Sequence, residues 1–134
     1  MTVRMENNFV DYVDLFDVAV ETLETAPRRL FEKLMGVLLK KYHEEEIELQ
    51  RLALEIDDMH VLPVDDLDEF YDTILDAVDD VKLFKKKLES IKKKEPLFQD
   101  LYEQMDALHT ALLHYMDRMG QLEIRLMDEQ KLSA

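Results

Sequence analysis

Residues 96–126 read PLFQDLYEQMDALHTALLHYMDRMGQLEIRL, and the spacing of their apolar residues indicates the fold class. Apolar residues recur in it at alternating intervals of three and four positions, from Phe98 to Leu126. Such a 3.5-residue repeat places one apolar stripe along a helix and is typical of helices that pack like a coiled coil. Pro96 stands at the start, where proline is tolerated in the first turn of a helix. The stretch therefore predicts one long helix over residues 96–131.

The same repeat extends through the rest of the chain. The breaks TAPR at 25–28, VLPVD at 61–65 and EP at 95–96 divide it into further predicted helices at residues 8–24, 27–60 and 65–94. Asn8 and Thr25 are the predicted N-caps of the first two helices. Short connections between helices favour antiparallel neighbours. We therefore predict an all-α fold of one domain over residues 1–134. It is an antiparallel up-down four-helix bundle with coiled-coil-like heptad packing, whose first helix is shorter than the others.

Composition limits the classes of function. The net charge of −14 disfavours contact with a phosphate backbone, so we expect no direct nucleic acid binding. The absence of cysteine excludes disulfides and thiolate metal sites. No apolar run approaches the roughly 20 residues of a membrane span, and the segment MTVRMENNF lacks the apolar region of a signal peptide. We expect a cytoplasmic protein.

One charged residue interrupts the apolar seams of the predicted helices. Glu45 lies in phase with its seam, and a buried carboxylate is costly unless it is paired, protonated or beside water. Folding the helices back at their turns places Glu45, Asp80 and His109 at one level of the bundle. The first interpretation is a Glu–His hydrogen bond or a carboxylate that reaches water. The alternative is a divalent metal site, since carboxylates with imidazole suit zinc, manganese or iron. Apart from that metal we expect no cofactor.

Catalytic patterns are weak in this sequence. Ser90 and Ser133 lack the context of a nucleophile, and the two glycines form no phosphate loop. Histidine phosphotransfer domains are helical bundles of similar size, and their histidine is followed by lysine and then a small residue. Here TALLH follows His109 and YMDRMG follows His114, so a phosphotransfer role is only a third hypothesis. We expect no enzymatic activity.

Charge is distributed unevenly between the two ends of the predicted bundle. Residues 82–94 hold seven lysines, and antiparallel folding brings the bases near residue 28 to the same end. This basic end comprises Arg28, Arg29, Lys33, Lys85, Lys86, Lys87, Lys92, Lys93 and Lys94. The opposite, acidic end comprises Asp57, Asp58, Asp65, Asp66, Asp68, Glu69, Asp72, Asp128 and Glu129. This layout matches helix dipoles, and it also predicts attraction to an acidic partner or to another copy's acidic end.

Several apolar residues fall outside the seams. Leu75 and Leu83 do so in the third predicted helix, and the predicted interaction surface comprises Val10, Leu15, Val18, Leu113, Met116 and Met127. So many apolar residues outside narrow seams indicate contact with a partner or a second copy. The expected function is a non-enzymatic protein–protein interaction module, such as an adaptor, assembly factor or chaperone-like bundle. Its partner is another protein or itself, most simply in a homodimer.

Overall fold

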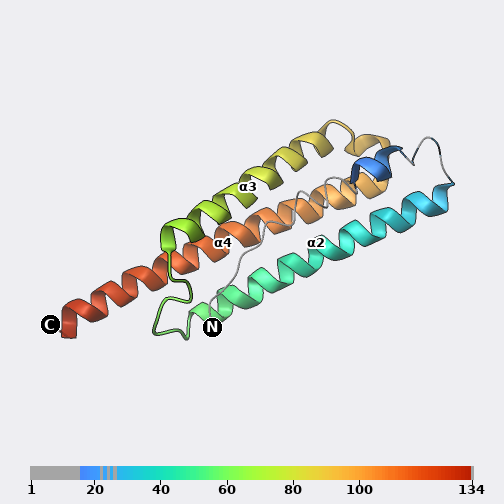
Figure 1. Ribbon diagram of the computed structural model, residues 1–134. Helices are drawn as coiled ribbons and strands as arrows, with labels where there is room; N and C mark the ends of the chain where they lie inside the picture. Colours follow the sequence, from blue (N-terminus) through green and yellow to red (C-terminus); the bar gives the residue numbers. More distant parts are fainter. Residues whose placement is uncertain (1–15, 22, 24, 26, 134) are drawn as a thin grey trace.

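The computed structural model describes residues 16–21, 23, 25 and 27–133, and these residues are almost entirely helical (Figure 1). A helical segment covers residues 16–21. It is followed by α2 (Arg28–Ile56), α3 (Leu67–Glu89), the short 3₁₀ helix η1 (Lys92–Lys94) and α4 (Pro96–Ser133). No strand occurs in the described part of the chain. The predicted all-α class is confirmed, whereas the predicted start of the first helix, at residues 8–15, lies outside the described residues.

The connection between α2 and α3 is longer than the sequence predicts. α2 ends at Ile56 rather than at residue 60, because Asp57 N–H bonds to the Leu54 carbonyl and tightens the chain into a turn. α3 begins at Leu67 because Asp66 caps it, accepting a hydrogen bond from the Glu69 N–H at 3.2 Å. Residues 57–66 therefore lengthen the connection between α2 and α3, and they do not extend either helix along its axis.

The N-cap of α2 differs from the predicted residue, Thr25. Thr25 does not cap this helix, because its hydroxyl donates to the Glu21 carbonyl four residues earlier, at 2.8 Å. Pro27 is the N-cap residue, and its carbonyl accepts the N–H groups of Leu30 and Phe31. α3 also ends earlier than predicted, at Glu89 rather than at residue 94, since η1 forms the last turn before α4.

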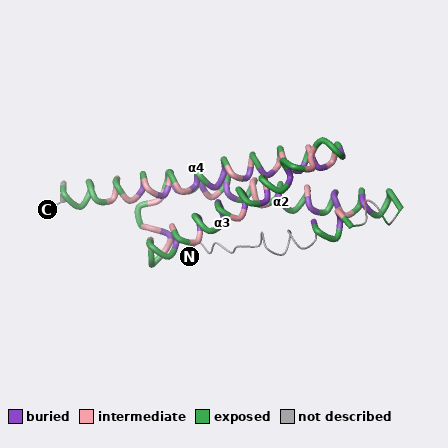
Figure 2. Tube along the Cα trace, turned by 90° about the horizontal axis from the view of Figure 1, so that it is seen from above, coloured by how far each residue is buried: buried purple, intermediate pink, exposed green. Residues whose placement is uncertain are grey.

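α4 lies between α2 and α3 and packs against both (Figure 1). α2 and α4 run in the same direction, and α3 runs in the opposite one. Side-chain contacts record this arrangement: Gln104 on α4 donates to Glu46 on α2 at 2.8 Å, while Asp106 pairs with Lys85 on α3 at 2.7 Å. The C-terminal end of α4 extends past the other helices in both views (Figures 1 and 2).

Buried residues recur at intervals along the helices (Figure 2). The predicted seam of α4 is buried from Phe98 to Leu122, with Leu126 at its half-buried end. Aromatic rings join the elements at the basic end. Phe98 contacts Phe16 and Phe31, with 5.6 Å between ring centroids in both pairs, and Phe84 lies 4.9 Å from Phe16. These contacts hold residues 16–21, α2, α3 and α4 around one apolar core.

Among the described residues, none of the helices combines the length and the apolar content that crossing a membrane requires.

Candidate functional site

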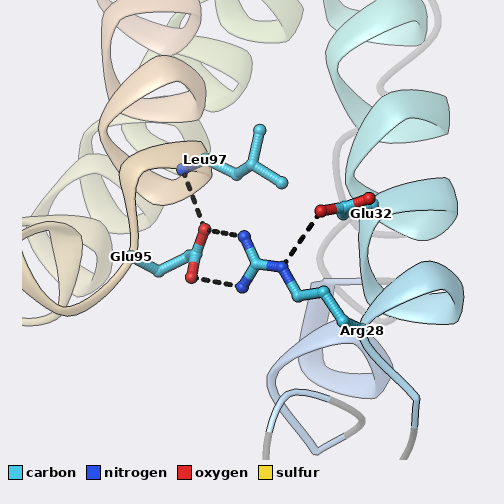
Figure 3. A network of polar contacts seen from close by, with 4 residues as sticks. All are labelled: Arg28, Glu32, Glu95 and Leu97. Carbon is cyan, nitrogen blue, oxygen red and sulfur yellow. Dashed lines mark hydrogen bonds and ion pairs between the residues drawn. The ribbon is translucent and has the colours of Figure 1, made fainter.

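A buried carboxylate links the beginnings of α2 and α4 (Figure 3). Glu95 is the one charged side chain that is buried among those the structure describes, with 5% of its surface exposed. The Arg28 guanidinium donates to both of its carboxylate oxygens at 2.5 Å, and the Leu97 N–H donates to Oε1 at 3.4 Å. Arg28 also pairs with Glu32 at 3.1 Å. The bidentate geometry fixes both helix ends relative to each other.

The electrostatics of this network agree with its geometry. Hydrogen bonding to Arg28 lowers the pKa of Glu95, and burial opposes that effect without reversing it. A carboxylate also suits this position because Glu95 immediately precedes Pro96, where the N-terminus of α4 favours negative charge. Glu95 is therefore ionised at neutral pH and engaged on both oxygens. The arrangement is suited to fastening helices and offers no unoccupied carboxylate for acid–base chemistry.

The three predicted metal ligands are not gathered into one site. Glu45, Asp80 and His109 are each half-buried, but the described residues contain no group of three or more His, Asp or Glu side chains placed to hold a metal ion. The contact between Glu46 and Gln104 shows why. Glu45 is level with the region of residue 104, about 8 Å along the axis from His109. Folding back at the turns misplaced Glu45, because connections such as residues 57–66 contribute no helical rise.

His109 lies on the flank of α4 that faces α3. Its Nε2 is buried and has no hydrogen-bond partner. Burial lowers the pKa of His109, and the charges of Lys85 and Lys82 lower it further, while Asp106 raises it. The imidazole is therefore neutral at neutral pH. A buried Nε2 does not favour phosphoryl transfer at this ring, and His114 is exposed as the repeat predicts.

The predicted interaction surface is exposed where it can be described. Val18, Leu113 and Met127 are 47%, 41% and 52% exposed, and Met116 is half-buried. Val10 and Leu15 lie outside the described residues. Leu75 and Leu83 are also exposed. Apolar side chains thus face solvent on α3 and α4 as well as at the N-terminal helical segment.

About half of the predicted basic end is engaged in ion pairs. Arg28 pairs with Glu95, Lys85 with Asp106, Lys87 with Asp17, and Lys92 with Glu89. Lys85 and Lys92 also lie over the Tyr102 ring. The remaining members form no ion pair with the described residues: Arg29, Lys33, Lys86, Lys93 and Lys94.

The acidic end is more open. A cleft of about 610 Å³ lies beside the C-terminal part of α4, lined by apolar side chains that include Val61, Leu62, Leu67 and Leu126. Glu123 and Glu129 stand at its edge. Arg118 pairs with Asp57, and Arg125 donates to the carbonyls of Asp57 and Met59, which holds the α2–α3 connection against α4. Reasoning from sequence did not find this cleft, because a connecting loop carries no periodic pattern.

The Arg28–Glu95 network was also missed from the sequence. The one local signal is an acidic residue directly before the proline that begins a predicted helix. Its partner stands 67 positions earlier in the chain, so no spacing rule connects the two residues.

Comparison with known proteins gives no relative: the chain matches no protein-family model, and no curated protein or solved structure is significantly similar to it.

Proposed function

We propose that this chain is a non-enzymatic protein–protein interaction module, an adaptor, assembly factor or chaperone-like helical bundle. The observation that carries the proposal is the set of apolar side chains exposed on the helix surfaces. Leu75, Leu113 and Met127 each expose more than a third of their surface, although the same helices bury a continuous core. Apolar side chains left exposed on a surface are a common mark of a binding site.

The architecture within this proposal is an up-down four-helix bundle with heptad packing. The alternating directions of α2, α3 and α4 support it (Figure 1), as does the spacing of buried residues along α4. The fourth helix of this bundle would be the predicted segment 8–24, of which residues 16–21 are described as helical. Such a bundle presents long helix faces that a second protein can contact.

The partner is another protein or a second copy of the chain, and we expect a homodimer in the cytoplasm. The distribution of charge favours one relative orientation of two associating molecules. The unpaired lysines near residues 86–94 and the aspartates near residues 65–72 lie at opposite ends of α3, so approaching molecules attract through unlike ends.

Native mass spectrometry of protein purified without chelator or affinity metal tests this proposal. The expected result is a metal-free homodimer, or a monomer that forms a stoichiometric complex with a protein partner. One bound metal ion per chain that is lost in His109→Ala would instead support a metal-binding bundle. A chain that remains monomeric and binds neither protein nor metal would contradict the interaction module.

A further inference from the structure

The outer face of the α3–α4 pair has a fixed register. Its α3 stripe spans residues 68–85 at alternating intervals of three and four: Asp68, Tyr71, Leu75, Val78, Lys82 and Lys85. Its α4 stripe spans residues 106–123 in the same way: Asp106, His109, Leu113, Met116, Gly120 and Glu123. Contacts join the two stripes at both ends, since Tyr71 donates to Glu123 at 3.2 Å and Lys85 pairs with Asp106 at 2.7 Å. Val78 is the buried member of these stripes, and the exposed Asp72 and Lys86 lie beside the α3 stripe. We call the exposed part of the two stripes, together with Asp72 and Lys86, the α3–α4 outer face.

The centre of the α3–α4 outer face is apolar. Because the helices are antiparallel and rise equally, the joined ends place Leu75, Leu113 and Met116 within about one turn of each other along the axis. Leu75 and Leu113 are 47% and 41% exposed, and Met116 is half-buried. These three side chains form an apolar strip that the fold itself does not cover.

Charges are arranged symmetrically about this strip. Asp72 and Lys82 lie five residues on either side of Ala77, and Asp68 and Lys86 lie nine residues on either side. All four charged side chains are exposed and form no ion pair with the described residues. Lys85 is different, because Asp106 already pairs with it. Asp79 is also exposed and stands near the centre of α3, whereas the free charges toward the two ends of the face are acidic at one end and basic at the other.

We propose that the α3–α4 outer face is the contact surface for a second copy of this chain, in an antiparallel dimer with two-fold symmetry. This inference rests on the proposed function and names its partner and its site. A two-fold axis at the level of Ala77 places Lys82 opposite Asp72 of the second copy and Lys86 opposite its Asp68. The same operation brings the two apolar strips together at the axis.

Overall charge does not prevent this contact. Each chain carries a net charge of −14, but charges farther apart than about 8–10 Å are largely screened at physiological salt. The interaction at contact is therefore decided by the residues that meet. A parallel arrangement would set lysines against lysines and aspartates against aspartates, whereas the antiparallel arrangement makes attractive pairs twice.

Sedimentation velocity on paired charge reversals tests the proposal with the full chain. One variant carries Lys82→Glu and Lys86→Glu, and the other carries Asp68→Lys and Asp72→Lys. We expect each variant alone to raise the dimer dissociation constant about tenfold or more, because symmetry repeats every reversal. The aspartate variant gives the more stringent test. It makes the net charge less negative, from −14 to −10 (−14 + 4), and would therefore strengthen association if only the overall repulsion mattered.

Mixing the two variants gives the decisive result. Each then presents charges opposite to those of the other, so an equimolar mixture is expected to recover the wild-type dissociation constant. The matched control is Lys33→Glu with Lys40→Glu on α2, which changes the net charge as the lysine variant does and leaves dimerisation within about twofold of wild type.

Three results would overturn the proposal: a monomeric wild type, a dimer insensitive to the reversals, or two weakened variants that do not recover on mixing. A dimer that is insensitive to the reversals would form through another face, and the proposed function would still stand. The proposed function would also stand if the chain were a monomer that binds a different protein. A monomer without any protein partner would overturn both.

Discussion

The basic end and the acidic end of the described helices differ in how fully their apolar side chains are enclosed. At the basic end, phenylalanine rings pack together, and Arg28 lies over Phe31 while it binds the buried carboxylate of Glu95. At the acidic end, Val61 is 73% exposed beside a cleft, and Met127 is 52% exposed. We therefore expect the basic end, where polar and apolar groups are both enclosed, to contribute more stability than the acidic end, which leaves apolar surface exposed to solvent.

The largest expected difference between the ends lies in the aromatic cluster. Phe98 is 1% exposed and contacts two other rings. Phe98→Ala is expected to lower the free energy of unfolding by about 3–5 kcal/mol, because it removes buried surface and leaves a cavity. Val61→Ala at the open end is expected to change it by less than about 0.5 kcal/mol. Urea denaturation measures both, and equal effects would contradict the comparison.

The Arg28–Glu95 pair has the next largest effect. Glu95→Gln keeps the size of the side chain and removes its charge, and we expect a loss of about 1–3 kcal/mol in urea denaturation. Glu32→Gln is the control, because Glu32 pairs with the same arginine but is exposed. Its effect should stay near zero. A loss as large in Glu32→Gln would show that Arg28, rather than the buried carboxylate, carries the stabilisation.

The same pair predicts a dependence on acid. The pKa of Glu95 is lowered in the folded chain. Its contribution is therefore present above the ordinary glutamate pKa and is lost as the pH falls through the lowered value. Thermal unfolding across the acid range should show wild type losing stability more steeply than Glu95→Gln. Parallel curves for the two proteins would contradict this assignment.

Tyr115 tests the core toward the open end. Its hydroxyl is buried without a hydrogen-bond partner, and burial raises its pKa to about 12, with a smaller effect from Glu48 and Glu55. Tyr115→Phe is expected to raise the free energy of unfolding by about 1 kcal/mol at neutral pH. As the pH rises above about 10, wild type should lose more stability than this variant, since Tyr115 is absent from the variant while Tyr71, whose pKa burial also raises, titrates in both proteins. A destabilised variant would show that the hydroxyl is satisfied, for example by water.

The smallest effect should be equal at both ends. Gly36 and Gly120 both lie within helices, and an added methyl group would meet nothing within 4 Å at Gly36 and only the Tyr71 hydroxyl at 3.8 Å at Gly120. Replacing either glycine by alanine should stabilise the chain by about 0.5–1 kcal/mol, since alanine loses less backbone freedom. A destabilised Gly120→Ala would reveal a close approach on the α3–α4 outer face.

Local patterns predicted the helices better than the contacts between them. The spacing of Phe98, Leu101, Met105 and Leu108 depends only on helical geometry, and all four are buried. The predicted layer of Glu45, Asp80 and His109 also required the register between helices. Register depends on how much chain each connection uses, and residues 57–66 use more than the pattern of prolines indicates. Glu95 was missed for a similar reason, because its burial depends on a distant arginine.

The most direct test of the account is cross-linking of a second copy through the α3–α4 outer face. The chain contains no cysteine, so Leu75→Cys supplies a single thiol close to the proposed two-fold axis. Leu54→Cys is the control, because Leu54 lies on α2, outside the proposed contact, and is 71% exposed in the wild type. With a short bismaleimide, we predict a covalent dimer of Leu75→Cys and little of Leu54→Cys. Equal yields for the two variants, or no dimer of Leu75→Cys, would contradict it.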